Sequence, residues 1–257
     1  MVSIQDRIVL VTGASSGIGA SCAEMFAKEG TALILAARRR DKLEEVAAKI
    51  EQTYQNQIYL LELDVCDRSA VEQSLTSLPE PWCNVDILVN NAGLSRGKDP
   101  LQTGEIQNWE EMIDTNIKGL LYVTRSLLPG MIERDRGHII NIGSIAGHQA
   151  YPGGNVYCAT KAAVRTLSQG LKMDLLGTPI RVSCVDPGTV ETDFSVVRFR
   201  GDTAKAKEVY AKMNPLTADD IAEIVVFCAT RPANVNMSEV LVMATDQSSA
   251  TMIHRHD

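Results

Sequence analysis

The sequence predicts a doubly wound α/β fold of the Rossmann type, in which a parallel sheet carries helices on both faces. Short apolar runs rich in β-branched residues alternate with runs of helical spacing from the start of the chain. The strand-like runs are almost continuously apolar, which is typical of strands buried on both faces of a parallel sheet. The first of these runs leads directly into a glycine-rich loop and then into a helix.

In the first half of the chain, strands are expected where the short apolar runs lie, at residues 7–12, 31–37, 58–63 and 85–89. Helices are expected between them, where apolar residues recur with helical spacing, at 18–28, 42–52 and 69–77. Gly30 suits the C-terminal cap of the first helix, and Pro79 and Pro81 end the third.

The second half continues the alternation, with helices expected at 109–128 and 157–176 and strands at 138–142 and 180–185. No internal repeat, low-complexity tract or linker interrupts it. The sequence therefore predicts a single domain over residues 1–257.

The composition limits the classes of function. Hydrophobic residues make up 45% of the 257 residues, which is ordinary for a globular protein. The net charge is −7, so we expect no nucleic-acid partner and no anionic membrane surface. No apolar run of about 18 residues and no signal-like N-terminus is found, which favours a cytoplasmic location. The six scattered cysteines are then expected to be reduced.

The alternation breaks after Pro187, where residues 189–214 are polar and carry several basic side chains. An insertion at the carboxyl end of a strand lies where such folds bind ligands, so this segment is a candidate lid over the substrate. The alternative is a solvated surface excursion with a helix near residues 203–213.

The glycine-rich loop predicts a phosphate site. Glycines between a strand and a helix let the backbone turn tightly and approach a pyrophosphate, and the helix N-terminus offers free N–H groups. The spacing G-x-x-x-G-x-G differs from G-x-G-x-x-G, but the strand-loop-helix context supports the same role. The expected contacts are Gly13, Ser15, Ser16, Gly17, Ile18 and Gly19.

The end of the second strand predicts which dinucleotide is bound. An NAD enzyme usually places an acid there for the ribose 2′-hydroxyl, whereas this chain has Arg38, Arg39 and Arg40 before its first acid, Asp41. Guanidinium groups bind a 2′-phosphate, so the sequence favours NADP(H), with Arg38 and Arg39 on the phosphate. The alternative is that these arginines only begin an exposed helix, as Arg40 is expected to do.

A candidate acid–base pair is formed by Tyr157 and Lys161, four residues apart on one helix face. A phenol loses its proton near pH 10, so a fixed cation is needed to lower its pKa by about two to three units. By itself this pair occurs by chance in many helices. Here other candidate motifs also follow neighbouring strands, which end at the ligand-binding edge. They are Asn90 to Gly93, Ser144, and Pro187 with Gly188.

Together these motifs resemble the short-chain dehydrogenase/reductase family over nearly the whole chain. The resemblance implies a sheet of seven strands and a catalytic tetrad of Asn116, Ser144, Tyr157 and Lys161. Tyr157 would be the general acid/base, Ser144 would orient the substrate oxygen, and Lys161 would hold the nicotinamide ribose and lower the pKa of Tyr157. Asn116 would anchor a water that relays protons to Lys161, and no metal would be required.

The same resemblance implies further cofactor contacts and an assembly. Asp64 and Val65 would flank the adenine. The cofactor channel and the nicotinamide end would be lined by Asn91, Ala92, Gly93, Pro187, Gly188, Val190 and Thr192. The assembly implied is a homotetramer, with the helices at 109–128 and 157–176 between subunits.

A narrower resemblance concerns the substrate. The stretches 81–86, 139–144, 153–157 and 194–201 are similar to the NADP-dependent 3-hydroxy acid dehydrogenases, which include the bacterial serine and L-allo-threonine dehydrogenase. The implied substrate is a small 3-hydroxy acid. Its carboxylate needs a cation, for which Arg198 is the first candidate and Arg96 and Arg200 are the others.

Two alternatives remain open at this stage. The first is a broader NADPH-dependent carbonyl reductase that acts on ketones or keto esters without a carboxylate. The second is a nucleotide-binding sensor that keeps the fold without turnover, against which the complete tetrad argues.

Overall fold

The computed structural model describes residues 2–257 and contains a seven-stranded parallel sheet in the order β3-β2-β1-β4-β5-β6-β7. The strands are β1 (Ile8–Thr12), β2 (Ala32–Ala37), β3 (Ile58–Glu62), β4 (Ile87–Asn90), β5 (His138–Ile142), β6 (Arg181–Pro187) and β7 (Glu239–Val242). The order reverses between β1 and β4, so a crevice is expected beyond the carboxyl ends of these two strands.

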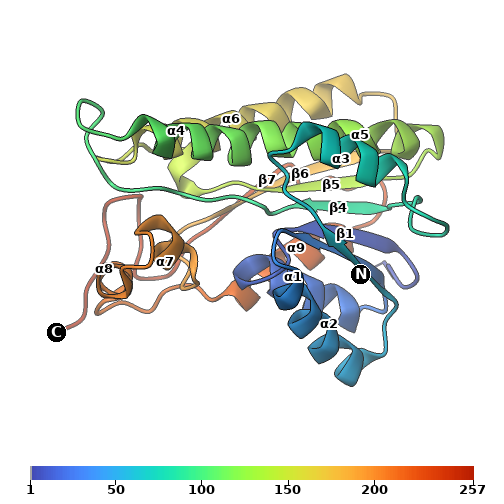
Figure 1. Cartoon of the computed structure of the whole chain (residues 1–257), viewed down its shortest axis with the longest axis horizontal. Coiled ribbons are helices and arrows are strands. Elements are labelled where there is room, and N and C mark those ends of the chain that lie inside the picture. The colour runs from blue at the N-terminus through green and yellow to red at the C-terminus, as the bar shows by residue number, and fades with distance from the viewer. Residues whose placement is uncertain (1) are drawn as a thin grey trace.

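Helices cover both faces of the sheet (Figure 1). One layer consists of α1 (Gly17–Lys28), α2 (Arg40–Tyr54) and α9 (Ala218–Ala229). The opposite layer consists of α3 (Arg68–Thr76), α4 (Ile106–Ile113), α5 (Leu120–Glu133) and α6 (Asn155–Asp174). The predicted doubly wound α/β class is therefore confirmed.

Successive side chains of the central strands point into two separate cores. Val9 and Val11 of β1 pack in the core under α1 and α9, whereas Ile8 and Leu10 pack in the core under α3 and α5. All five residues of β1 are buried. Because both faces are covered, the strand has to be apolar throughout, which is the pattern that predicted a parallel sheet.

The predicted strands agree with the structure to within two residues at each end. The largest differences are two residues, since β6 ends at Pro187 rather than at residue 185 and β4 begins at Ile87 rather than at residue 85. Asp86 precedes β4, and its carboxylate accepts a hydrogen bond from the backbone N–H of Ile8 at 2.9 Å. The strand therefore starts only after this buried carboxylate.

The prediction of one continuous helix over 109–128 is wrong. The structure has α4, then a π-helical segment over Asp114–Gly119, then α5. Such wide turns insert one extra residue and often occur at functional sites. Here the segment contains Asn116, whose buried side chain hydrogen-bonds outside its own helix.

No residue ranges were predicted from the sequence for α9 and β7. The signal for α9 is Thr217 followed by Asp220, a reciprocal capping box in which the Thr217 hydroxyl accepts from the Asp220 N–H at 3.2 Å and the Asp220 carboxylate accepts from the Thr217 N–H at 2.7 Å. The short strand β7 is only partly buried, so its apolar pattern is weak.

Residues 189–214, called the lid segment below, contain α7 (Phe194–Arg198) and α8 (Thr203–Tyr210). They lie beside the sheet, next to the C-terminal tail (Figure 1). The helix expected over 203–213 ends at Tyr210. The tail returns to the lid segment, where the His256 N–H donates to the Lys212 carbonyl at 2.7 Å.

Among residues 2–257, we find no helix that is both long enough and apolar enough to cross a membrane.

Candidate active site

The glycine-rich loop joins β1 to α1 and is shaped by its backbone. Gly13 and Gly17 have φ values of +64° and +53°, a region that favours glycine. A side chain at Gly19 would place its Cβ 2.3 Å from the Gly13 carbonyl oxygen. Three glycines are therefore required for this turn, which leads into the N-terminus of α1, where an anion is stabilised.

Thr12 and Asn91 connect this loop to the end of β4. The Asn91 side-chain amide donates to the carbonyl oxygens of Thr12 and Gly13 at 2.9 and 3.2 Å. The Thr12 hydroxyl accepts from the backbone N–H groups of Asn91 and Ala92, both at 3.0 Å. The sequence argument did not assign Thr12 to the site, although its position just before Gly13 is the signal that could have found it.

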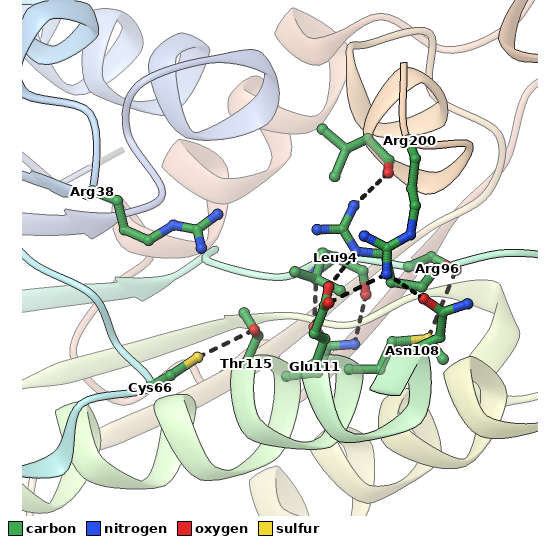
Figure 2. Close-up of polar contacts among 12 residues, drawn as sticks. Arg38, Cys66, Leu94, Arg96, Asn108, Glu111, Thr115 and Arg200 are labelled. Carbon is green, nitrogen blue, oxygen red and sulfur yellow. Dashed lines mark hydrogen bonds and ion pairs between the residues drawn. The ribbon is translucent and has the colours of Figure 1, made fainter. Parts of the chain in front are cut away.

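The predicted 2′-phosphate arginines lie at the end of the same cavity. Arg39 donates to the Ser15 hydroxyl at 3.3 Å, and Arg38 lies 3.9 Å from the Asp64 carboxylate. The side chain of Arg38 (labelled in Figure 2) is 65% exposed, so it is free to bind a ligand from solvent. Arg40 begins α2 and pairs with Glu44, which agrees with the prediction that this residue begins an exposed helix.

The predicted cofactor contacts come together in a single cavity. It is lined by the glycine loop and by the ends of β2 to β6, and it includes Gly13, Ser15, Ser16, Gly17, Ile18, Arg38, Arg39, Asp64, Val65, Asn91, Ala92, Gly93, Pro187, Gly188, Val190 and Thr192. Gly19 lies directly behind it, against Gly13. Ser144, Tyr157 and Lys161 line the same cavity.

Asn116 fixes the loop after β4 against α6. Its side-chain oxygen accepts from the Leu94 N–H at 2.8 Å, and its amide donates to the Leu94 carbonyl at 2.9 Å and to the Thr160 hydroxyl at 3.0 Å. A Cβ at Gly93 would lie 3.3 Å from the Asn116 side-chain oxygen and 3.5 Å from the Lys161 nitrogen. Gly93 therefore lies next to both Asn116 and Lys161.

The catalytic candidates Ser144, Tyr157 and Lys161 are all buried. Lys161 donates to the Ile142 carbonyl at 2.8 Å. The Tyr157 ring packs against the Phe194 ring of the lid segment, with centroids 5.7 Å apart. An amine and a phenol in one cavity can hold and move a proton at a substrate oxygen.

Burial dominates the pKa values of this pair. It lowers the pKa of Lys161 to about 8, against the opposing effect of Cys184 and Asp186. It raises the pKa of Tyr157 above its ordinary value, against the opposing effects of the Ser144 hydroxyl and Arg198. The sequence argument predicted a lowered pKa for Tyr157, and for the chain by itself this is wrong because desolvation of the phenolate outweighs the favourable neighbours.

Asp186 supports Ser144 and was missed by the sequence argument. Its carboxylate, which is fully buried, accepts the Ser144 backbone N–H at 3.0 Å. It fits only because residue 143 is glycine, where a Cβ would lie 1.8 Å from the carboxylate oxygen. An aspartate just before the Pro187-Gly188 pair is the signal that could have found it.

We expect Gly143→Ala to lower kcat by at least about tenfold, because the new methyl group displaces Asp186 and with it the backbone of Ser144. Steady-state kinetics and the thermal midpoint of the variant check this. The matched control is Gly177→Ala, where no atom lies within 4 Å of the added Cβ, so its kinetics should not change, although its positive φ lowers stability. Full activity of Gly143→Ala would contradict this role of Asp186.

The three arginines proposed for the substrate differ in their partners, and Figure 2 shows those of Arg96 and Arg200. Arg96 donates to the Glu111 carboxylate and to the Val197 carbonyl, both at 2.5 Å. Arg200 donates to the Asn108 side-chain oxygen at 2.6 Å and lies 3.3 Å from Glu111. Arg198 donates to the Gly97 carbonyl at 2.8 Å through Nε, while its Nη2 is buried without a hydrogen-bond partner within residues 2–257.

One group of possible metal ligands adjoins this site, because it includes Asp186, which accepts the Ser144 N–H. His148, Asp186 and Glu239 are the cluster among residues 2–257 whose ligand atoms lie within 4.8 Å of one another. The imidazole of His256 lies 2.9 Å from the Asp246 carboxylate and packs edge-on against His254. All six cysteines are free thiols, as predicted.

Comparison with known proteins gives the family. The family model for short chain dehydrogenases matches residues 7–202. The NADP-dependent 3-hydroxy acid dehydrogenase YdfG of Escherichia coli (strain K12) is 48% identical, over 96% of this chain and 99% of its own length. The NADP-dependent 3-hydroxy acid dehydrogenase of Schizosaccharomyces pombe is 43% identical, over 99% of each chain.

A solved structure described as the closed form of serine dehydrogenase complexed with NADP+ is also similar. It superposes with a TM-score of 0.90 and is 48% identical, over 95% of this chain and 97% of that one. The chain therefore belongs to the short-chain dehydrogenase/reductase family.

Proposed function

We propose that the protein is an NADP-dependent oxidoreductase that interconverts a small 3-hydroxy acid and the corresponding 3-oxo acid. The observation that carries the reaction class is the single cavity in which Ser144, Tyr157 and Lys161 meet the glycine loop. The relatives named for this activity support the choice of substrate.

The residues fit NADP(H). The glycine loop leaves backbone and a helix N-terminus for a pyrophosphate, and Arg38, Arg39 and Ser15 lie together where a 2′-phosphate would be bound. The bound dinucleotide supplies the hydride acceptor, and in its oxidised form a positive charge that favours the phenolate of Tyr157. Tyr157, Lys161, Gly93 and Pro187 would hold its nicotinamide end.

The side chains of the chain itself would handle the proton. In oxidation, Tyr157 accepts the hydroxyl proton of the substrate, and in reduction it returns the proton to the carbonyl oxygen. Ser144 donates a hydrogen bond to that oxygen, and its own backbone is held by Asp186. Lys161, which keeps its charge below about pH 8, stabilises the phenolate.

Arg198 is proposed to bind the substrate carboxylate. Its unpartnered Nη2 is buried, it borders the cavity that contains Tyr157, and its charge is one of the smaller effects that oppose the raised pKa of the phenol. A buried guanidinium N–H without a partner is costly, and a carboxylate would satisfy it.

The experiment that tests this function follows the absorbance of reduced nicotinamide with L-serine, L-allo-threonine and 3-hydroxypropionate in the presence of NADP+. Ethyl acetoacetate with NADPH serves as the substrate without a carboxylate. Oxidation of the hydroxy acids supports the proposal. Activity on the keto ester alone would favour the alternative function, a broader carbonyl reductase. NADPH binding without turnover of any carbonyl substrate would favour the other alternative, a nucleotide-binding sensor.

We expect Arg198→Ala to raise KM for the 3-hydroxy acids by about 10- to 100-fold, because a hydrogen bond to a charged group contributes about 1.5–3 kcal/mol. KM for ethyl acetoacetate should change by less than about threefold. Lys207→Ala, an exposed cation on α8, is the matched control and should behave as the wild type. An unchanged KM for the hydroxy acids would assign their carboxylate to another residue.

We also propose that the protein is a cytoplasmic homotetramer with α4, α5 and α6 between its subunits. Exposed apolar side chains on these helices and just after α6 support the assembly, namely Ile106, Ile113, Leu121, Ile132, Met173 and Leu176.

A further inference from the structure

The lid segment is joined to the rest of the protein by one acidic side chain and two arginines. Glu111 projects from α4 toward the lid, Arg200 reaches it from the lid segment, and Arg96 comes from the loop after β4 (Figure 2). One Glu111 oxygen lies 2.5 Å from Arg96 and the other lies 3.3 Å from Arg200. The second nitrogen of Arg96 donates to the lid carbonyl of Val197 at 2.5 Å.

Backbone contacts at the same place bring Arg198 to the loop after β4. The Gly97 N–H donates to the Arg198 carbonyl at 3.0 Å, and the Arg198 side chain donates back to the Gly97 carbonyl at 2.8 Å. Arg200 has φ of +50°, an unfavourable value for a residue with a side chain. The contacts of its guanidinium with Asn108 and Glu111 compensate for that conformation.

We propose that Glu111 is a specificity-determining positioning residue that fastens the lid segment. Its carboxylate forms ion pairs with Arg96 and Arg200, so that Arg198 is the arginine left to bind an anionic substrate. This inference rests on the proposed function for its substrate, but not for the fastening itself. Glu111 does not touch the reacting atoms and acts through the lid.

The charge state of Glu111 agrees with this role. Burial by itself raises the pKa of the carboxyl, but the hydrogen bonds and charges of Arg96 and Arg200 outweigh it and hold the pKa below its usual value. The side chains of Arg96 and Glu111 are only 16% and 26% exposed, so this pair is less screened by water than a surface pair. The carboxylate is therefore ionised at neutral pH.

The test compares Glu111→Gln with Glu110→Gln, the neighbouring glutamate, which is exposed and keeps the same helix composition. The first readout is tryptic cleavage after Arg198, Arg200 and Lys205 in the lid segment. We expect Glu111→Gln to be cleaved at least about fivefold faster than the wild type, because the lid loses its anchor and opens more often. Glu110→Gln should be cleaved at the wild-type rate.

The second readout separates KM from kcat. For Glu111→Gln we expect KM for 3-hydroxypropionate to rise about tenfold, with kcat and the KM for ethyl acetoacetate within about threefold of the wild type. The double variant Arg96→Gln/Glu111→Gln should lose less than the sum of the two single variants, because both changes break the Arg96–Glu111 contact, although Arg96 also loses its contact with Val197. A general loss of stability would instead change both substrates alike.

Equal cleavage rates in Glu111→Gln and Glu110→Gln, with equal KM values, would overturn the proposal. If the wild type oxidises no hydroxy acid, the proposed substrate is wrong, and faster cleavage of Glu111→Gln would still support the fastening role. Should Glu111→Gln fail to fold, Arg200→Gln removes one side of the same contact and is expected to speed lid cleavage in the same direction.

Discussion

Replacing Tyr157 with phenylalanine is expected to lower kcat by about 10³-fold, within the range of a positioned general acid/base. The change removes only the hydroxyl group that accepts and returns the substrate proton. The ring stays in place, because it is buried and packs against Phe194. Steady-state rates with NADP+ and a 3-hydroxy acid measure the loss.

The matched measurement is NADPH binding by fluorescence, which should change by less than about threefold in the same variant, since the glycine loop and the two arginines keep their proposed contacts with the cofactor. Tyr151 lines the same cavity as Tyr157, so Tyr151→Phe is the control for loss of a phenol hydroxyl outside the tetrad. If Tyr157→Phe keeps more than a tenth of the wild-type kcat, another group transfers the proton.

Replacing both Arg38 and Arg39 with alanine is expected to lower kcat/KM for NADPH by about 10²-fold and to leave kcat/KM for NADH nearly unchanged. Each charge-assisted hydrogen bond to a phosphate contributes about 1.5–3 kcal/mol, and exposure of these side chains favours the lower end. The cofactor preference, measured as the ratio of the two values, should therefore shift toward NADH.

Arg40→Ala is the matched control, because Arg40 lies next in the chain but pairs with Glu44 on the exposed face of α2. It should keep the preference for NADPH. An unaltered preference in the double variant would mean that the arginines only begin the helix, which is the alternative that the sequence left open.

The architecture could be predicted from the sequence because its signals are local. Continuous apolar runs such as residues 31–37 indicate strands covered on both faces, and their alternation with helices fixes a parallel, doubly wound sheet. The site candidates follow, since the carboxyl ends of parallel strands meet at one edge. Ser144, Asn91 and the glycine loop meet there as predicted.

The tertiary structure alone determined how these groups affect one another. The π-helical segment around Asn116 depends on its hydrogen bonds to Leu94 and Thr160, which lie far away in the sequence. The pKa of Tyr157 depends on how deeply the phenol is buried, and no residue spacing reports that depth.

The same holds for the charged side chains around the substrate. In the sequence, Arg198 ranks before Arg96 and Arg200, and nothing local indicates that Glu111 pairs with the other two. The sequence by itself determined the fold class, the cofactor loop and the catalytic candidates, because periodicity and turn chemistry act over a few residues. Only the tertiary structure decided which arginine keeps a free N–H, because ion pairs between distant segments depend on the packing of the whole chain.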